Sequence, residues 1–256
     1  ITCEWIPSPY EEIGDGDYGN HDKADRPANQ RIRYIVIHDT EGAYDGVVSL
    51  AQDPTYSASW HYTLRNSDGH IAQHVKSKDV AWHAGNWDVN AKSIGLEHEG
   101  WAARGTWYSE AMYRRSAKLV RYLAKRFDIP LDRQHILGHD NVQGPTGDYI
   151  PGMHWDPGPF WDWAHYFDLL GAPFRAQGPG RFDGPVEPGV VTVRPNFDRN
   201  VHPFTGCENN PGPPDEEVPP QCGEWGSSAV FVHTEPRHDA PLVRDEVPGR
   251  ADNHVF

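Results

Sequence analysis

A short run of β-branched residues constrains the fold more than any other feature of the chain. Residues 33–38 read Arg-Tyr-Ile-Val-Ile-His, and the run passes directly into the polar residues Asp39 and Thr40. A continuous apolar run of this length is typical of a strand that is covered on both faces. It therefore predicts an α/β protein, in which functional groups follow the ends of buried strands.

Other segments extend this pattern. Residues 60–64 and 71–75 flank Asn66-Ser67-Asp68-Gly69, and this turn signal predicts a β-hairpin. Ser109 is placed to cap a long amphipathic helix whose apolar stripe runs along one face. The remaining predicted elements are strands at 93–99 and 134–137, a helix at 109–127, and a helix at 160–170 that is closed by Gly171. Together they predict a central mixed β-sheet flanked by helices.

Composition divides the chain near residue 171. All Lys residues precede this point, whereas most of the 23 Pro residues follow it. We therefore expect a compact domain (31–170) with an N-terminal segment (1–30) packed on it, followed by a Pro-rich extension (171–256). Strand-like runs occur in the extension at 190–193 and 229–233. The chain ends at Phe256 without an obvious closing strand, so we expect the C-terminal module to be incomplete here or to be cut during maturation.

Charge and cysteine content narrow the function classes. The formal net charge of −14 disfavours nucleic acid as a partner, because phosphate binding needs a basic surface. No apolar run is long enough for a membrane-spanning helix. Cys207 and Cys222 bracket a Pro-rich loop, and a disulfide between them is expected if the protein is secreted, which leaves Cys3 unpaired. The missing initial Met agrees with secretion.

Three polar residues near strand ends and loops suggest a metal site. His38 ends the buried strand, His139 follows a short strand and a glycine, and Asp156 precedes the last helix. Two imidazoles and one carboxylate are the ligands of a catalytic Zn²⁺ site that keeps a fourth position for water. The spacing matches no local zinc motif, and with 15 His in the chain each one is also explained as a satisfied, half-buried residue.

Six sequence blocks in order carry a family resemblance. They resemble the type 2 class of zinc-dependent N-acetylmuramoyl-L-alanine amidases, which share their fold with the peptidoglycan recognition proteins. The resemblance covers roughly residues 30–170. The blocks are Ile-Val-Ile-His-Asp-Thr (35–40), Trp-His-Tyr-Thr-Leu (60–64), Ala-Trp-His-Ala-Gly (81–85), Ser-Ile-Gly-Leu-Glu (93–97), Gly-His (138–139) and Asp-Pro-Gly-Pro (156–159).

This resemblance implies roles for individual residues. The metal ligands fall on His38, His139 and Asp156, with one Zn²⁺ as the cofactor, and the catalytic Glu falls on Glu97. Strand alternation places Glu97 and Glu99 on one face, so Glu99 is the alternative for the same role.

The resemblance also implies the groups that meet the substrate. Many relatives have a Lys two residues before the third ligand, where this chain has His154, which we expect to stabilise the oxyanion. Where relatives have a Tyr in the hairpin, this chain has Trp60, which has no hydroxyl group. The residues expected to bind substrate are His61, Trp60, Trp82, His83 and Asn86. His61 and His83 are explained equally well as buried residues. A Trp such as Trp82 more often belongs to the core or to the wall of a groove.

Three functions agree with these features. The first is zinc-dependent hydrolysis of the amide between N-acetylmuramic acid and L-Ala of peptidoglycan. We expect such an enzyme to be a bacterial, bacteriolytic monomer that is secreted or associated with the cell wall. The second is a non-catalytic domain that binds peptidoglycan or muropeptides. The third is an unrelated metallohydrolase. Residues 228–243 resemble the start of an SH3-like wall-binding module, or form a linker that packs on the catalytic domain.

Overall fold

Six strands form the central sheet of the protein, in the order β1-β5-β4-β7-β3-β8. The structure, a computed structural model, describes residues 1–12, 14, 19–105, 107–175, 192–202, 224–235, 237 and 239–241. Strand β3 runs parallel to β7 and β8, whereas β4 and β5 are antiparallel, so the sheet is mixed as predicted. The strands are β1 (Glu4–Trp5), β5 (Ile71–Gln73), β4 (Tyr62–Leu64), β7 (Ser93–His98), β3 (Tyr34–Asp39) and β8 (Ile136–Gly138).

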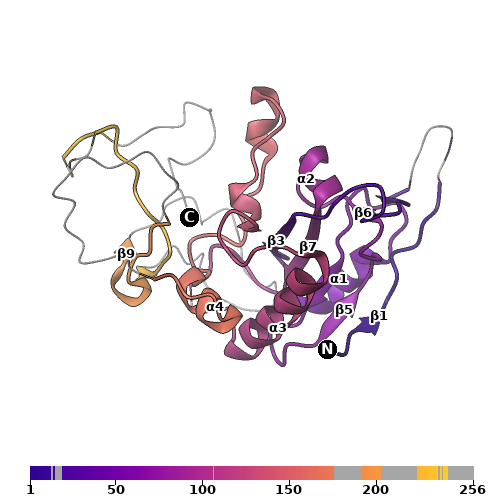
Figure 1. Cartoon of the computed structure of the whole chain (residues 1–256), viewed down its shortest axis with the longest axis horizontal. Coiled ribbons are helices and arrows are strands. Elements are labelled where there is room, and N and C mark those ends of the chain that lie inside the picture. The colour runs from indigo at the N-terminus through magenta and orange to yellow at the C-terminus, as the bar shows by residue number, and fades with distance from the viewer. Residues whose placement is uncertain are drawn as a thin grey trace.

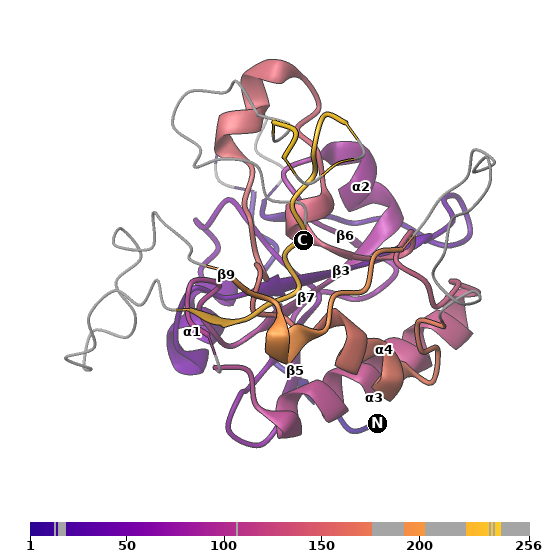
Figure 2. The same ribbon diagram turned by 90° about the vertical axis from the view of Figure 1, so that its left-hand side faces the viewer.

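Two helices cover one face of this sheet. Helix α3 (Glu110–Phe127) begins after Ser109, whose side chain accepts a hydrogen bond from the backbone N–H of Met112, as a cap should. Helix α4 (Trp163–Leu170) begins after Asp162, three residues later than predicted, and ends at Gly171 in a left-handed conformation. The two helices lie side by side under the sheet (Figures 1 and 2) and share its main core with Trp161.

Alternation along β3 separates this core from a second face. Ile35 and Ile37 belong to the core beneath α3, whereas Val36 packs on the other side with Ala84 and Met153. Because side chains alternate, His38 shares the face of Val36. The functional residues of β3 and β7 therefore lie on the face opposite α3.

Several short elements were not predicted. Helix α1 (Tyr44–Ala51) has no side-chain cap, and α2 (Trp87–Lys92) has only six residues. A two-stranded sheet joins β2 (His21–Asp22) to β6 (Val80–Ala81). The other short elements are η1 (His139–Asn141), η2 (Gly147–Gly152), η3 (Phe197–Arg199), β9 (Val201–His202) and β10 (Trp225–Gly226). None of the helices in the described part of the chain is both long and apolar enough to span a membrane.

Residues before β3 are tied to the sheet at two places. Strand β1 adds to the edge of the central sheet beside β5. Arg26 is buried, and its guanidinium donates hydrogen bonds to the backbone carbonyls of Asn90, Ala91 and Ser93. These contacts hold the start of the chain against α2 and β7.

The described parts of the C-terminal extension also contact the catalytic domain. Ser228 donates a hydrogen bond from its backbone N–H to the carbonyl of Pro159 and from its hydroxyl to the carbonyl of Trp161. The Trp225 ring packs with Ala103 and Phe160. This is the arrangement expected for a linker that packs back on the domain.

In the extension, one predicted strand is wrong, and other predictions fall on residues outside the described part of the chain. The strand predicted at 229–233 is wrong: this segment contains only isolated bridge residues, because its polar groups contact Asn200 and the turn that ends at Pro241. Cys207, Cys222 and residues 190–191 of the predicted strand at 190–193 lie outside the described residues, whereas residues 192–193 are described and form no strand. Cys3 is a free cysteine packed against the main core.

Candidate metal centre

The centre is built where β3 and β7 end. The parallel register places His38 of β3 beside Glu97 of β7, and both side chains lie on the face opposite α3. The ends of neighbouring parallel strands meet at one edge of a sheet, which brings these two groups together without any local motif.

Two further segments complete the cluster. His139 begins η1 directly after β8, and Asp156 lies in the loop that follows η2. The backbone N–H of Asp140 donates a hydrogen bond to the backbone carbonyl of Asp156, which ties the two segments together. The Nδ1 atoms of His38 and His139 lie 3.1 and 3.0 Å from the two carboxylate oxygens of Asp156. One potential ligand atom from each of these three residues lies within 4.8 Å of the others, and all three residues are buried.

Charges in the cluster suit cation binding. Burial and the neighbouring His139 lower the pKa of His38 to about 4, so the ring is neutral at neutral pH and can act as a ligand. Burial opposes ionisation of Asp156, but His139, His154 and His38 hold the pKa of this carboxyl well below its usual range. The Nε2 atom of His139 is buried without a hydrogen-bond partner among the described residues. Two imidazoles and an ionised carboxylate could hold a single divalent metal ion.

His83 fixes the orientation of one of these imidazoles. Its Nδ1 lies 2.9 Å from Nε2 of His38, and its Nε2 lies 3.0 Å from the hydroxyl of Ser93. The contact leaves Nδ1 of His38 turned toward Asp156. Gly95 makes room for this ring, because a Cβ at that position would lie 2.5 Å from the His83 ring. His83 is therefore a positioning residue.

Replacing His83 by Ala is expected to weaken metal binding about 10- to 100-fold, the usual effect of losing a residue that orients a ligand. Competition with a fluorescent zinc chelator measures the affinity. Ser93→Ala, which removes only the outer partner of His83, serves as the milder control. An unchanged affinity in His83→Ala would contradict the positioning role.

Glu97 lies at the edge of the cluster. Its side chain is 14% exposed, and its Oε1 lies 3.9 Å from Nδ1 of His38. Its Oε2 is buried and has no hydrogen-bond partner among the described residues. Burial, together with Asp156 and Glu41, raises the pKa of Glu97 well above its usual range. A carboxyl group in this setting is suited to taking up and releasing a proton.

Glu99, the alternative to Glu97, has a different environment. It lies just beyond the end of β7, and its two carboxylate oxygens accept hydrogen bonds from the backbone N–H groups of Tyr44 and Asn66. These bonds stabilise the start of α1 and the hairpin. Both oxygens are engaged by the backbone, so the geometry favours Glu97 for chemistry.

His154 stands on the open side of the cluster. Its side chain is 73% exposed, and its Nδ1 lies 3.6 Å from Oδ1 of Asp156. Its ring lies against the ring of His139, with 5.0 Å between their centroids. An exposed imidazole beside the ligands is placed to meet a bound substrate.

Four residues predicted to bind substrate have other partners. His61 is fully buried, its Nδ1 accepts from the N–H of Gly95, and its Nε2 lies 3.2 Å from the carbonyl of Asp79. Trp60 is buried against α1 and donates from its indole to Thr63. These positions leave neither residue a surface for substrate, so we do not retain their predicted substrate contacts.

The other two belong to the wall beside α2. Asn86 caps α2 by accepting from the backbone N–H groups of Asp88 and Val89, and its amide donates to the carbonyl of Gln143. The half-buried Trp82 donates from its indole to Asp22. Asn86 therefore has a structural role that the sequence analysis did not assign to it.

Tyr108 is a residue of the site that the sequence analysis missed. Its hydroxyl lies within hydrogen-bond distance of Asp39 and 2.9 Å from the carbonyl of Pro157. Asp39 follows the candidate ligand His38, and Pro157 follows the candidate ligand Asp156, so Tyr108 joins the two segments that carry them. The only signal in the sequence was the position of Asp39 next to His38.

A buried carboxylate between two imidazoles, with a second carboxyl group beside them, could hold one metal ion in the manner of metal-dependent hydrolases. The family model for N-acetylmuramoyl-L-alanine amidase matches residues 28–159, and the chain belongs to this family. The catalytic interpretation is thus favoured over the non-catalytic one: the protein is an amidase of peptidoglycan.

Two curated relatives agree with this assignment. The N-acetylmuramoyl-L-alanine amidase A of Achromobacter lyticus is 32% identical over 159 residues, which are 56% of this chain and 85% of the relative. The AmpD amidase of Citrobacter freundii is 26% identical over 188 residues, 64% of this chain and 88% of the relative. A crystal structure of a selenomethionine AmpD derivative aligns with a TM-score of 0.46 and 25% identity, covering 66% of this chain and 94% of the other.

Proposed function

We propose that the protein is a zinc-dependent hydrolase that cleaves the amide between N-acetylmuramic acid and L-Ala in peptidoglycan and its muropeptides. The observation that carries the proposal is the buried group of His38, His139 and Asp156, with Glu97 beside it. Incubation with purified muropeptides tests it. Release of a stem peptide with a free L-Ala amino group is the expected result, and intact muropeptides after prolonged incubation would contradict it.

The three ligand residues fit a single Zn²⁺. Their imidazole and carboxylate groups are ligands that Zn²⁺ accepts, and three protein ligands are usual in catalytic sites. Two buried atoms, Nε2 of His139 and Oε2 of Glu97, have no hydrogen-bond partner in the part of the chain that the structure describes, which agrees with a centre that holds a further group. When bound, Zn²⁺ supplies a Lewis acid that lowers the pKa of a water molecule to about 7.

Glu97 handles the proton of the reaction. Its carboxylate takes the proton from the attacking water as the new C–O bond forms at the lactyl carbonyl. It then delivers that proton to the nitrogen of L-Ala as the C–N bond breaks. The raised pKa of Glu97 supports this role, because it brings the group closer to the pH at which it must work.

His154 stabilises the negative charge that develops on the carbonyl oxygen. Its exposure and its place beside the ligands support this role, and an N–H of the imidazole supplies the hydrogen bond. Many members of the amidase class that this chain resembles have a Lys at the position of His154.

Replacing His154 by Ala is expected to lower the turnover number about 100-fold, the usual cost of losing one oxyanion donor, with the metal content unchanged. Because the His154 side chain is exposed, its removal should leave the fold intact, so a loss of turnover reports on the reaction. His154→Lys is the informative comparison, since it should recover part of the rate. Steady-state kinetics and metal analysis of the same variants measure the turnover number and the zinc content. Loss of zinc in His154→Ala would show that His154 is a ligand instead.

The domain organisation belongs to the same proposal. We propose residues 31–170 as the catalytic domain, with the described residues of 1–30 packed against it and residues 171–256 as its extension. Contacts of Ser228 and Trp225 with the domain support a packed extension more than a separate SH3-like module. We further propose a secreted or wall-associated monomer with bacteriolytic activity, because its substrate is the cell wall.

A further inference from the structure

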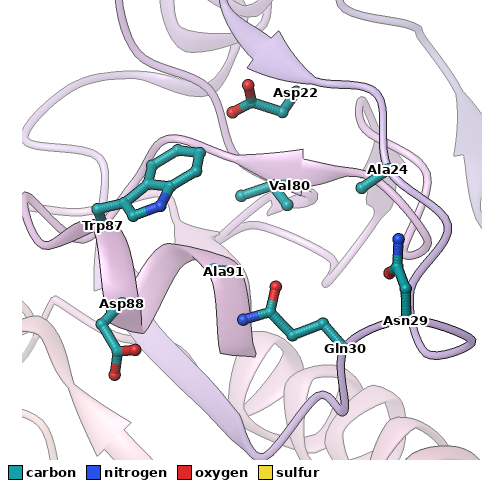
Figure 3. Close-up of a pocket in the computed structure, with 8 residues that line it drawn as sticks. All are labelled: Asp22, Ala24, Asn29, Gln30, Val80, Trp87, Asp88 and Ala91. Carbon is teal, nitrogen blue, oxygen red and sulfur yellow. The ribbon is translucent and has the colours of Figure 1, made fainter.

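A surface hollow lies beside α2, and neither the ligands nor Glu97 contribute to it (Figure 3). Its volume is about 350 Å³. Three segments that are distant in the sequence form it: the chain around β2, the strand β6 and the helix α2. The lining residues are Asp22, Ala24, Asn29, Gln30, Val80, Trp87, Asp88 and Ala91.

An aromatic ring and an apolar floor shape one part of the hollow. Trp87 is 59% exposed, and its indole extends over the side of Val80 instead of packing into the core (Figure 3). Val80 and Ala91 contribute small apolar surfaces below it. A large indole left in water costs hydration free energy, which burial against a ligand would recover.

Polar groups complete the wall. The amide of Gln30 extends toward Ala91, and the amide of Asn29 lies on the side of Ala24 (Figure 3). Asp22 accepts from the Trp82 indole through Oδ2, and no described residue donates to its other oxygen. Asp88 points away from the hollow and pairs with Lys92.

We propose that this hollow is a subsite for an N-acetylated hexosamine of the glycan strand, an inference that rests on the proposed function. A pyranose ring presents C–H groups that pack on an indole face, while its hydroxyls and acetamido group match amide and carboxylate partners. The acidic lining disfavours an anionic ligand, since Asp22 faces the hollow and the described lining residues include no cation. A neutral amino sugar fits these conditions.

Residues 82–87 connect the hollow to the metal centre. Trp82 donates a hydrogen bond to Asp22 at the hollow, and the next residue, His83, contacts His38 at the metal centre. Asn86 then caps the helix that carries Trp87. A polymeric substrate extends beyond the unit that is cleaved, so a sugar bound here adds affinity for the polymer without touching the reacting bond.

Trp87→Ala tests the subsite, with Trp5→Ala as the matched control. Trp5 is 49% exposed and lies on β1, outside the hollow. We expect Trp87→Ala to raise the half-saturating concentration of insoluble peptidoglycan about tenfold, while kcat/KM on a soluble muropeptide without a neighbouring sugar stays within about twofold. Trp5→Ala should match the unaltered protein on both substrates.

Direct binding separates this inference from the proposed function. In NMR spectra of the indole N–H groups, titration with tri-N-acetylchitotriose should shift the Trp87 signal, which is identified by its loss in Trp87→Ala. Gln30→Ala should reduce the shift. If the Trp87 signal shifts while the unaltered protein cleaves no muropeptide, the subsite stands and the proposed function fails. If muropeptides are cleaved but the signal does not move and Trp87→Ala matches the unaltered protein on peptidoglycan, the subsite is refuted.

Discussion

Glu97→Gln is expected to retain zinc and to lose turnover by about a thousandfold. An amide has nearly the shape of the carboxylate but cannot accept the proton of the attacking water, and general base catalysis contributes about 10²- to 10⁴-fold. Glu97 is the carboxyl group beside His38 that has a buried oxygen without a partner in the described structure. Kinetics on a muropeptide and metal analysis of the same preparation measure both effects.

Glu99→Gln is the matched control for this variant. Glu99 accepts two backbone hydrogen bonds from Tyr44 and Asn66, so its replacement should lower the unfolding temperature and leave most of the turnover. If Glu99→Gln were inactive and Glu97→Gln active, the assignment of the base would be wrong.

Complete removal of the metal is expected to lower the rate of muropeptide cleavage about a thousandfold or more, because the loss of a Lewis acid raises the barrier by several kcal/mol. Treatment with a strong chelator, followed by dialysis, prepares the metal-free protein. The main core beneath α3 and α4 does not include the ligands, so the fold should persist and circular dichroism should change little.

Restoration is the control for this experiment. One equivalent of Zn²⁺ should return the activity of the unaltered protein, whereas His38→Ala should remain inactive with the same addition. Cleavage that persists in fully metal-free protein would rule out the zinc mechanism.

Much of the fold followed from local sequence patterns. The run that forms β3, the turn between β4 and β5 and the stripe of α3 each have one strong periodic or turn signal. Helices α1 and α2 were missed because they are short, and α1 contains Gly46 and two adjacent valines, which weaken a helical pattern. The Asn86 cap was the available signal for α2, but it was interpreted as a substrate contact.

The candidate site could be predicted only in part. Their places near strand ends and loops suggested grouping His38, His139 and Asp156, but only the family resemblance made the grouping specific, since His38 lies more than 100 positions from the other two. Trp60 was misinterpreted because the helix that buries it, α1, was not predicted. For His61 the sequence left a buried and a substrate-binding role equally open, because the buried environment around Arg26 depends on tertiary contacts that leave no local pattern.

A crystal structure of the zinc-loaded protein, with anomalous data collected on both sides of the zinc absorption edge, tests the central claim most directly. The account predicts a single strong anomalous peak within bonding distance of His38, His139 and Asp156, with Glu97 beside it and not bound to it. A peak bound elsewhere, or no peak at these three residues in a protein that still cleaves muropeptides, would contradict it.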